Sequence, residues 1–204
     1  MLKEFENLKT LEDWGKHQFN ANLSSVFGWG MLGEQHFLVS KVLLMECWMA
    51  KNEYYSSDIR EFEYGTREFE LLQKTYFYEP ATLFLALSFE NLLKGIWVKE
   101  NETTLIKSDS IPNLLNTHYL TKLARECTLN LSKEEEEMLK LLTIFSKWRG
   151  KYNLPLNKKE NVNFWEGKFQ VDFLIRKYPG DFGFPDEVKS LRMKISERLN
   201  RNLL

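Results

Sequence analysis

Hydrophobic and polar residues recur along most of the chain at the three- and four-residue spacing of amphipathic helices. The first such stretch predicts a helix over residues 34–55, with apolar positions at Phe37, Leu38, the stem of Lys41, Val42, Leu44, Met45 and Trp48. Gly28, Gly30 and Gly33 come just before it and predict a loop. A second, more polar helix is predicted over residues 57–78, and Gly65 is expected to break it.

The most apolar stretch of the chain follows Pro80 and covers residues 81–98. Proline suits the first turn of a helix, where its missing N–H leaves no hydrogen bond unmade. The stretch is shorter than the roughly 20 residues that cross a bilayer, and Glu90, Asn91 and Lys94 interrupt it. The pattern therefore predicts a central core helix rather than a membrane span.

The second half of the chain predicts three further helices. After a connection over residues 101–116, Asn116 or Thr117 is expected to cap a helix whose apolar face carries Leu120, Leu123, Ala124 and Cys127. Ser132 and Glu135 have the spacing of a capping box, and the helix after them has a core face formed by Met138, Leu141, Leu142, Phe145 and Trp148. The last helix is predicted from about Pro185 to Leu199.

Turn signals separate these last two helices. Gly150, Asn153 and Pro155 are expected to end the capping-box helix, a polar loop is expected over residues 157–163, and a turn at Pro179-Gly180-Asp181. The chain contains no internal repeat and no low-complexity tract. We therefore predict a single all-α domain over residues 1–204, a helical bundle.

Charge and composition narrow the class of protein. The chain has 28 Lys and Arg against 29 Asp and Glu, a formal charge of −1, which argues against coating nucleic acid through bulk charge but allows a local basic patch. Two cysteines cannot build a disulfide scaffold or a four-cysteine zinc site, and they favour a reducing compartment. Residues 1–6 are charged and lack the apolar core of a signal peptide, so we expect a cytoplasmic protein without a membrane segment.

Three segments, in order, resemble the HEPN superfamily of helical-bundle proteins. The first is Leu85-Ala86-Leu87-Ser88-Phe89-Glu90-Asn91-Leu92-Leu93-Lys94-Gly95, similar to a family helix in which Leu-Leu-Lys follows a Glu. The second is Thr117-His118-Tyr119-Leu120 with Leu123-Ala124, close to a Gly-His-Asp-Leu and Leu-Ala pattern. The third runs from Leu131-Ser132-Lys133-Glu134-Glu135 to Trp148-Arg149-Gly150-Lys151-Tyr152, similar to a Ser-x-Glu-Glu helix that ends in Arg-x-x-Tyr-Pro.

The resemblance implies a HEPN-like core over residues 80–155, with flanking helices over residues 34–78 and 160–200. It also implies either a metal-independent ribonuclease or an RNA-binding partner in defence, toxin–antitoxin or RNA-processing systems, often dimeric. The ribonuclease branch carries an Arg followed, after four to six residues, by a His. No His follows Arg149 at that distance, and the three histidines are His17, His36 and His118. The resemblance therefore favours a catalytically silent member, since the chemistry needs a proton acceptor near the attacking hydroxyl.

Glu90 is the most informative single residue. It lies in a helix that is apolar on nearly every side, so its carboxylate is expected to be buried and paired. Lys94 lies one turn later and is one candidate partner, and Arg149 is the other. A structural ion pair and a catalytic or ligand-binding carboxylate are both open at this point.

The other candidate residues have both a structural and a functional interpretation. His118 either closes the start of its helix or takes part in chemistry with Glu90 and Arg149. A modest basic patch with stacking aromatics is predicted from Arg125, Arg149, Lys151, Tyr152, Lys122, Lys147 and Trp148, unless the lysines are simply solvated and Trp148 is core. Cys47 and Cys127 lie on apolar helix faces and are expected to be buried. No spacing indicates a metal site or a cofactor.

The sequence thus favours a non-catalytic binding protein whose partner is RNA, a nucleotide or another protein, with Lys94, Arg125, Arg149, Lys151 and Tyr152 as binding residues. One alternative is a metal-independent endoribonuclease with a non-standard site at Glu90, His118 and Arg149. A second is a purely structural, self-associating protein. The six Trp, eight Tyr and fifteen Phe favour an apolar interface and hence a homodimer, with a monomer whose added helices cover that surface as the alternative.

Overall fold

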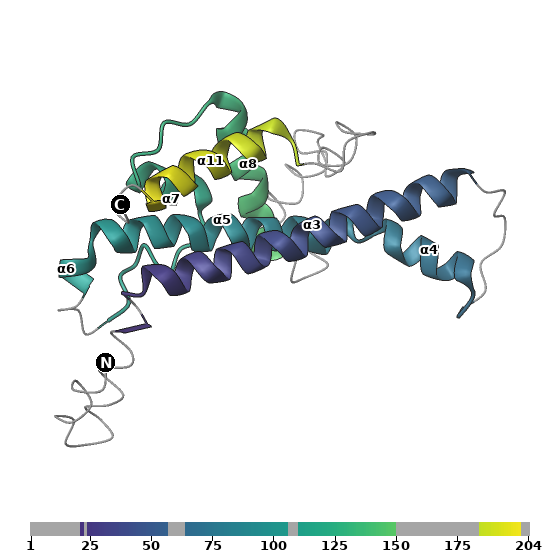
Figure 1. Cartoon of the computed structure of the whole chain (residues 1–204), viewed down its shortest axis with the longest axis horizontal. Coiled ribbons are helices and arrows are strands. Elements are labelled where there is room, and N and C mark those ends of the chain that lie inside the picture. The colour runs from purple at the N-terminus through teal and green to yellow at the C-terminus, as the bar shows by residue number, and fades with distance from the viewer. Residues whose placement is uncertain (1–20, 23, 57–63, 106–109, 150–183, 201–204) are drawn as a thin grey trace, which may run out of the picture.

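Helices make up the regular structure in the part of this protein that the structure describes. The computed structural model describes residues 21–22, 24–56, 64–105, 110–149 and 184–200, and for Thr104, Trp148 and Arg149 it describes the backbone alone. The elements are α3 (Val26–Ser56), α4 (Arg67–Thr75), α5 (Tyr78–Glu100), α6 (Glu102–Leu105), α7 (Leu120–Glu126), α8 (Lys133–Ile144), the π-helical η1 (Phe145–Arg149) and α11 (Asp186–Asn200) (Figure 1). No strand occurs within these ranges, which confirms the predicted all-α class.

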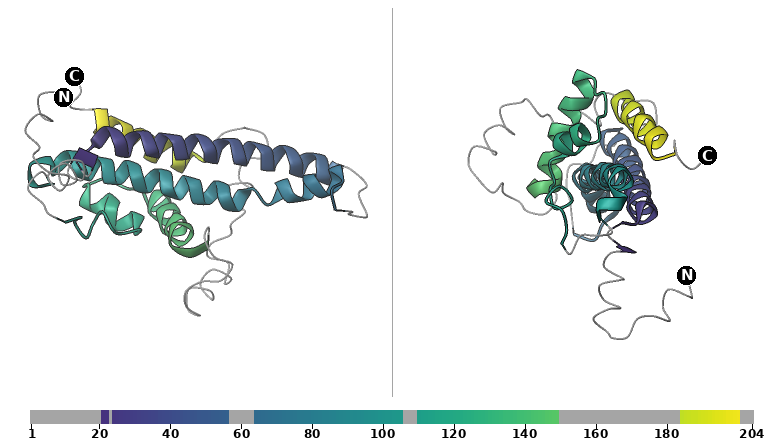
Figure 2. Two further views of the ribbon diagram at one scale, coloured as in Figure 1. Left: turned by 90° about the horizontal axis from the view of Figure 1, so that it is seen from below. Right: turned by 90° about the vertical axis from the view of Figure 1, so that its left-hand side faces the viewer.

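The long helices α3 and α5 run antiparallel, side by side, along the length of the molecule (Figures 1 and 2). Helices α7 and α8 lie on the side of α5 away from α3 (Figure 2). Helix α11 contacts both α5 and α8. It is also attached to α3, because Arg192 donates to Glu34 over 2.6 Å and its guanidinium lies 4.1 Å from the centre of the Phe37 ring.

The loop predicted at Gly28, Gly30 and Gly33 is wrong, because α3 begins at Val26 and contains all three glycines. The physical reason is close helix packing, which a missing side chain permits. A Cβ built on Gly33 would lie 2.6 Å from Cγ of Leu92 on α5. On the facing helix, a Cβ on Gly95 would lie 3.3 Å from Cβ of Trp29. Gly33 and Gly95 thus serve as packing residues rather than as helix breakers.

The apolar positions predicted for the first helix do not form one face. Phe37 is buried and Leu44 packs at the edge of the core, whereas Leu38, Val42 and Met45 are exposed. The buried line of α3 consists of Gly33, Phe37, Ser40, Cys47 and Ala50. Helix α3 is therefore apolar on two sides, of which α5 covers one.

The entry into α5 agrees with the turn signals. Gly65 has a positive φ of 84°, and Thr66 caps α4 by accepting a hydrogen bond from the N–H of Phe69. Pro80 lies in the first turn of α5, as predicted. By length and composition, the helical stretch Arg67–Glu100 is apolar enough to cross a membrane. However, 78% of its most apolar window is buried inside the protein, as in the core helix of a soluble protein.

Helix α7 starts later than predicted. Its first residue is Leu120, and neither Asn116 nor Thr117 caps it. A tertiary contact takes the place of the local cap, because Oγ1 of Thr143 on α8 accepts a hydrogen bond from the N–H of Leu120. The capping box of α8 is confirmed in both directions between Ser132 and Glu135. The final helix, Asp186–Asn200, lies close to its predicted range. The turns predicted over residues 150–183 lie outside the described residues.

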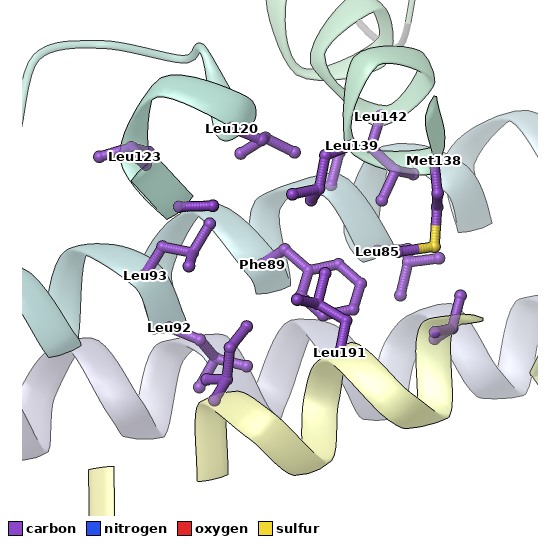
Figure 3. Packing of buried hydrophobic residues seen from close by; sticks show 14 of the residues in the cluster. Leu85, Phe89, Leu92, Leu93, Leu120, Leu123, Met138, Leu139, Leu142 and Leu191 are labelled. Carbon is purple, nitrogen blue, oxygen red and sulfur yellow. The ribbon is translucent and has the colours of Figure 1, made fainter. Parts of the chain in front are cut away.

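One hydrophobic core joins α5, α7, α8 and α11 (Figure 3). Its largest fully buried side chains include Leu85, Phe89, Leu93, Leu120, Leu123, Leu139 and Leu142. Cys47 and Cys127 are fully buried, as predicted, and their thiols donate to the backbone oxygens of Thr75 and Leu93. Burial raises the pKa of the Cys127 thiol to about 12, which keeps it protonated and unreactive.

Candidate functional site

A buried ionic cluster lies in the middle of α5. The carboxylate of Glu90 accepts a hydrogen bond from Nζ of Lys94 at Oε1, over 2.7 Å, and lies 2.9 Å from Nδ1 of His118 at Oε2. We call these three residues the Glu90 cluster. Both oxygens of the buried carboxylate thus have a hydrogen-bond partner, which is the condition under which a charge is tolerated in a protein interior.

Local sequence explains one half of the cluster and tertiary structure the other. Glu90 and Lys94 are one helical turn apart, so α5 itself brings their side chains together. His118 comes from the connection before α7, 28 residues further on. Its backbone is held by η1, because the hydroxyl of Ser146 donates to the carbonyl of His118 over 3.3 Å. A π-helical turn of this kind is rare and often occurs at functional sites.

The three side chains differ in their access to solvent. The side chains of Glu90 and Lys94 are each 6% exposed, whereas that of His118 is 44% exposed. The imidazole is therefore the end of the cluster that a ligand can reach. Any chemistry of the buried carboxylate with a ligand must pass through His118.

The contact with Glu90 determines which ring nitrogen of His118 is available. An ionised carboxylate only accepts hydrogen bonds, so Nδ1 of His118 must carry the hydrogen that bonds to Oε2. In the neutral imidazole, Nε2 is then the acceptor atom. His118 is thus oriented either to accept a hydrogen bond from a ligand or to take up a proton.

Tyr119, the residue after His118 in the chain, forms a pair with the cation of Lys147. Tyr119 is half exposed, and Nζ of Lys147 on η1 lies 4.5 Å from the centre of its ring and 3.0 Å from its hydroxyl oxygen. Tyr119 is adjacent to His118 in the chain. We call His118, Tyr119 and Lys147 the His118 surface. It combines an imidazole, an aromatic ring and an ammonium group.

Next to Glu90, Asn91 connects α5 to His36 on α3. Its Nδ2 donates to the carbonyl of Leu87 over 2.7 Å and lies 3.2 Å from Nδ1 of His36. Burial lowers the pKa of His36 below its ordinary value of 6.5. A neutral ring can accept the hydrogen bond from the amide, so this pair has a structural explanation.

The remaining predicted residues are placed as follows. Arg125 lies on α7 and pairs with Glu136 over 2.5 Å, which makes it part of a surface ion pair rather than of the Glu90 cluster. The backbone of Arg149 ends η1, and its pairing with Glu90 stays a prediction. Lys151 and Tyr152 lie outside the described residues. Among the residues that the structure describes, no group of His, Cys, Asp or Glu is arranged to hold a metal ion.

Sequence reasoning found the Glu90–Lys94 pair and offered His118 beside Glu90 as one of two alternatives, but it did not indicate which of the two holds. It missed Tyr119, which had no signal of its own except its position beside a histidine. A helix periodicity cannot indicate which loop residue approaches a buried carboxylate, because the approach depends on the path of the connection before α7.

Comparisons with known proteins identify no relative. No family model matches the chain, and no match was found among curated proteins or solved structures. The function must therefore be argued from the residues themselves.

Proposed function

We propose that this chain is a HEPN-like protein that binds single-stranded RNA at the His118 surface without cleaving it. The observation that carries the proposal is the half-exposed imidazole of His118, anchored on a buried carboxylate, with the half-exposed ring of Tyr119 next in the chain and Lys147 in contact with that ring. Imidazole and phenol rings stack on unpaired bases, and an ammonium group binds the phosphate beside them.

The packing of the three HEPN-like segments supports the family part of the proposal. Residues 85–95, 117–124 and 131–149 contribute to one hydrophobic core. Their polar residues also meet, since Glu90 of the first segment contacts His118 of the second, and Ser146 of the third bonds to the backbone of His118. Three segments that belong to one domain of a common family are expected to pack together in this way.

The charge balance of the chain defines what kind of RNA binding to expect. A formal charge of −1 provides no bulk attraction for phosphate, so a short, unpaired segment bound through a few contacts is favoured over a duplex. A base stacked on Tyr119 would contribute about 1–3 kcal/mol. Lys147 would add one phosphate contact and a modest salt dependence.

Fluorescence anisotropy with a labelled single-stranded oligoribonucleotide at several salt concentrations tests this proposal. We expect Tyr119→Ala to weaken binding by about 1–3 kcal/mol, and Lys147→Ala to reduce the slope of log K against log salt by about 0.7. Tyr76→Ala and Lys189→Ala are matched controls, because Tyr76, in the turn between α4 and α5, and Lys189, on α11, are exposed residues outside the His118 surface and should leave affinity unchanged. Absence of binding at every salt concentration would refute the RNA proposal and favour a protein partner.

A second candidate function, a metal-independent endoribonuclease, is favoured by the Glu90–His118 hydrogen bond. A carboxylate that orients an imidazole makes its Nε2 a competent general base. His118 would remove the proton of a ribose 2′-hydroxyl, whose oxygen would attack the adjacent phosphorus and displace the 5′-oxygen. That oxygen takes up a proton from water as it leaves, and the products carry a 2′,3′-cyclic phosphate and a 5′-hydroxyl.

Incubating RNA with the protein in the presence of EDTA, followed by analysis of the new ends, separates the two functions. Cyclic phosphate ends that disappear with His118→Ala and with a 2′-deoxy substrate would establish the nuclease. Intact RNA, together with binding by anisotropy, is the result that we expect.

A further inference from the structure

The outer side of α3 is an apolar surface that no other described element covers. Its exposed large hydrophobic residues between positions 27 and 49 are Phe27, Met31, Leu32, Leu38, Val39, Val42, Met45 and Met49. Among the charged residues between these positions, Lys41 is exposed, whereas Glu34 and Glu46 are half-buried and pair with Arg192 and Lys74. Contiguous exposed apolar surfaces of this kind are uncommon on soluble monomers and mark interaction sites.

The exposed residues follow a heptad repeat. Met31, Leu38 and Met45 are seven residues apart, and Val42 and Met49 form a second series four residues after the first. Alternating steps of four and three residues define the a and d positions of a coiled coil. We call these five residues, with Gln35 at the remaining a position, the α3 seam. It runs for about 27 Å along the helix.

The seam lies opposite the face of α3 that is buried in the fold. Gly33, Ser40 and Cys47 are also seven residues apart, and they are buried against the rest of the molecule. In heptad terms they occupy the f position, which points directly away from the a and d positions. Figure 2 shows α3 at the outside of the molecule, with α5 on its inner side. A helix that is apolar on two opposite faces needs a neighbour on each.

We propose that α3 pairs with α3 of a second copy of this chain in a parallel, two-stranded coiled coil. A heptad seam is complementary to itself, and a two-fold axis brings each a and d residue next to its own counterpart. Val42 at an a position and Leu38 at a d position suit a two-stranded coil, and a single polar residue, Gln35, at an a position fixes the register.

Charge complementarity favours the parallel orientation. In a parallel pair, the g residue of one helix faces the e residue of the next heptad on its partner. Here the g residue is Lys41 and the e residue is Glu46 of the second copy. The two-fold axis forms this pair twice. Within its own chain Glu46 already accepts a hydrogen bond from Lys74, and a carboxylate has room for more than one donor. This inference is independent of the proposed RNA binding.

Light scattering coupled to size exclusion tests the dimer. We expect the wild-type chain to have a mass of about twice 24.3 kDa. Leu38→Lys should halve that mass, because it places a charge at the centre of the seam. Met193→Lys is the matched control: Leu38 is 60% exposed and Met193, on α11, is 59% exposed. The control should stay dimeric, and circular dichroism should show the same helix content in all three proteins.

A monomeric wild-type chain at every concentration would overturn the proposal. Equal dissociation by Leu38→Lys and Met193→Lys would do the same, because the effect would then not belong to the seam. A monomer that cosediments with phospholipid vesicles, and stops doing so in Leu38→Lys, would reassign the face to a lipid surface.

Disulfide cross-linking tests the orientation. In a parallel, in-register pair, Met31→Cys and Met45→Cys should each form a cross-link between two identical copies, because every d position meets its own counterpart. In an antiparallel pair a position meets itself only at the centre of the coil. The native Cys47 and Cys127 are buried and do not compete, and Met193→Cys provides the control. Cross-linking at one or neither of the two positions would refute the parallel arrangement.

Discussion

At the scale of single residues, the buried carboxylate of Glu90 is the feature on which most else depends. It has a cationic partner from its own helix, Lys94, and an imidazole partner from a distant loop, His118. Burying such a pair gives little net stability, but breaking it leaves an uncompensated charge in the interior. Removing one member of the pair should therefore destabilise the fold more than replacing both members with apolar residues.

Unfolding of variants in urea measures this asymmetry. We expect Glu90→Leu and Lys94→Met each to destabilise the fold by about 3 kcal/mol, and the double variant to cost clearly less than the sum. Glu53→Gln in the exposed Arg67–Glu53 pair is the control and should cost less than about 1 kcal/mol. Additive effects of the two buried substitutions would show that the pair is not coupled.

A second buried carboxylate, Glu135, makes stability depend on pH. Burial alone would raise its pKa, but hydrogen bonds from Lys194, the N–H of Ser132 and Ser190 outweigh burial and lower the pKa below its ordinary value of 4.5. A group with a lowered pKa in the folded state contributes stability at pH values above its unfolded pKa. That contribution is lost as the pH falls from about 4.5 through the folded value.

Thermal melts of Glu135→Gln across the acidic range check this dependence. We expect the variant to melt lower than wild type at neutral pH, and the difference to shrink as the pH falls below 4.5. Glu137→Gln, an exposed neighbour on α8, is the control and should follow the wild-type curve. A constant difference at every pH would contradict the assignment to Glu135.

At the scale of elements, the contact between α3 and α5 depends on Gly33, which sequence rules alone would place in a loop. A side chain at Gly33 would clash with Leu92 and come close to the backbone oxygen of Ser88, and neither neighbour can move away easily. At Gly30, three residues earlier on the same helix, an added Cβ meets nothing within 4 Å. These two positions therefore form a natural pair for mutation.

Alanine substitutions at the two glycines should change the free energy of unfolding in opposite directions. Gly33→Ala is expected to destabilise the fold by about 1–3 kcal/mol through overpacking. Gly30→Ala is expected to stabilise it by about 0.4–1 kcal/mol, because alanine has the higher helix propensity and restricts the unfolded chain. Urea unfolding of both variants checks the pair. Stabilisation by Gly33→Ala would mean that the two helices do not approach as described.

At the scale of the whole molecule, the two proposed surfaces lie on different sides of α5. The His118 surface belongs to the α7 and η1 side, and the α3 seam faces outward on the other side (Figure 2). A dimer through the seam would therefore leave both His118 surfaces accessible. Two binding sites on one particle increase the apparent affinity for a ligand that is long enough to reach both.

Comparing RNAs of two lengths tests this separation. Leu38→Lys should bind a short oligoribonucleotide as tightly as wild type and a long one more weakly, because the second site is lost. Tyr119→Ala should weaken both RNAs and leave the dimeric mass unchanged. Loss of short-RNA binding in Leu38→Lys, with helix content preserved, would show that the two surfaces are not independent.

The sequence by itself determined the features that depend on neighbouring residues. The helical class, the turn at Gly65, the capping box at Ser132 and the burial of Glu90 beside Lys94 all follow from side chains within one or two turns of each other. These features are local, so the hydrophobic periodicity and the capping residues of the sequence predict them directly.

The tertiary structure decided the features that join distant parts of the chain. Leu120 needs no local cap because Thr143 accepts its N–H, and Glu90 reaches His118 because η1 holds that loop against α5. Helix α3 has two apolar faces, and the sequence cannot indicate which one α5 covers, because both satisfy the same spacing. The glycines at the α3–α5 contact resolve that choice, since only the face carrying Gly33 allows α5 to approach so closely.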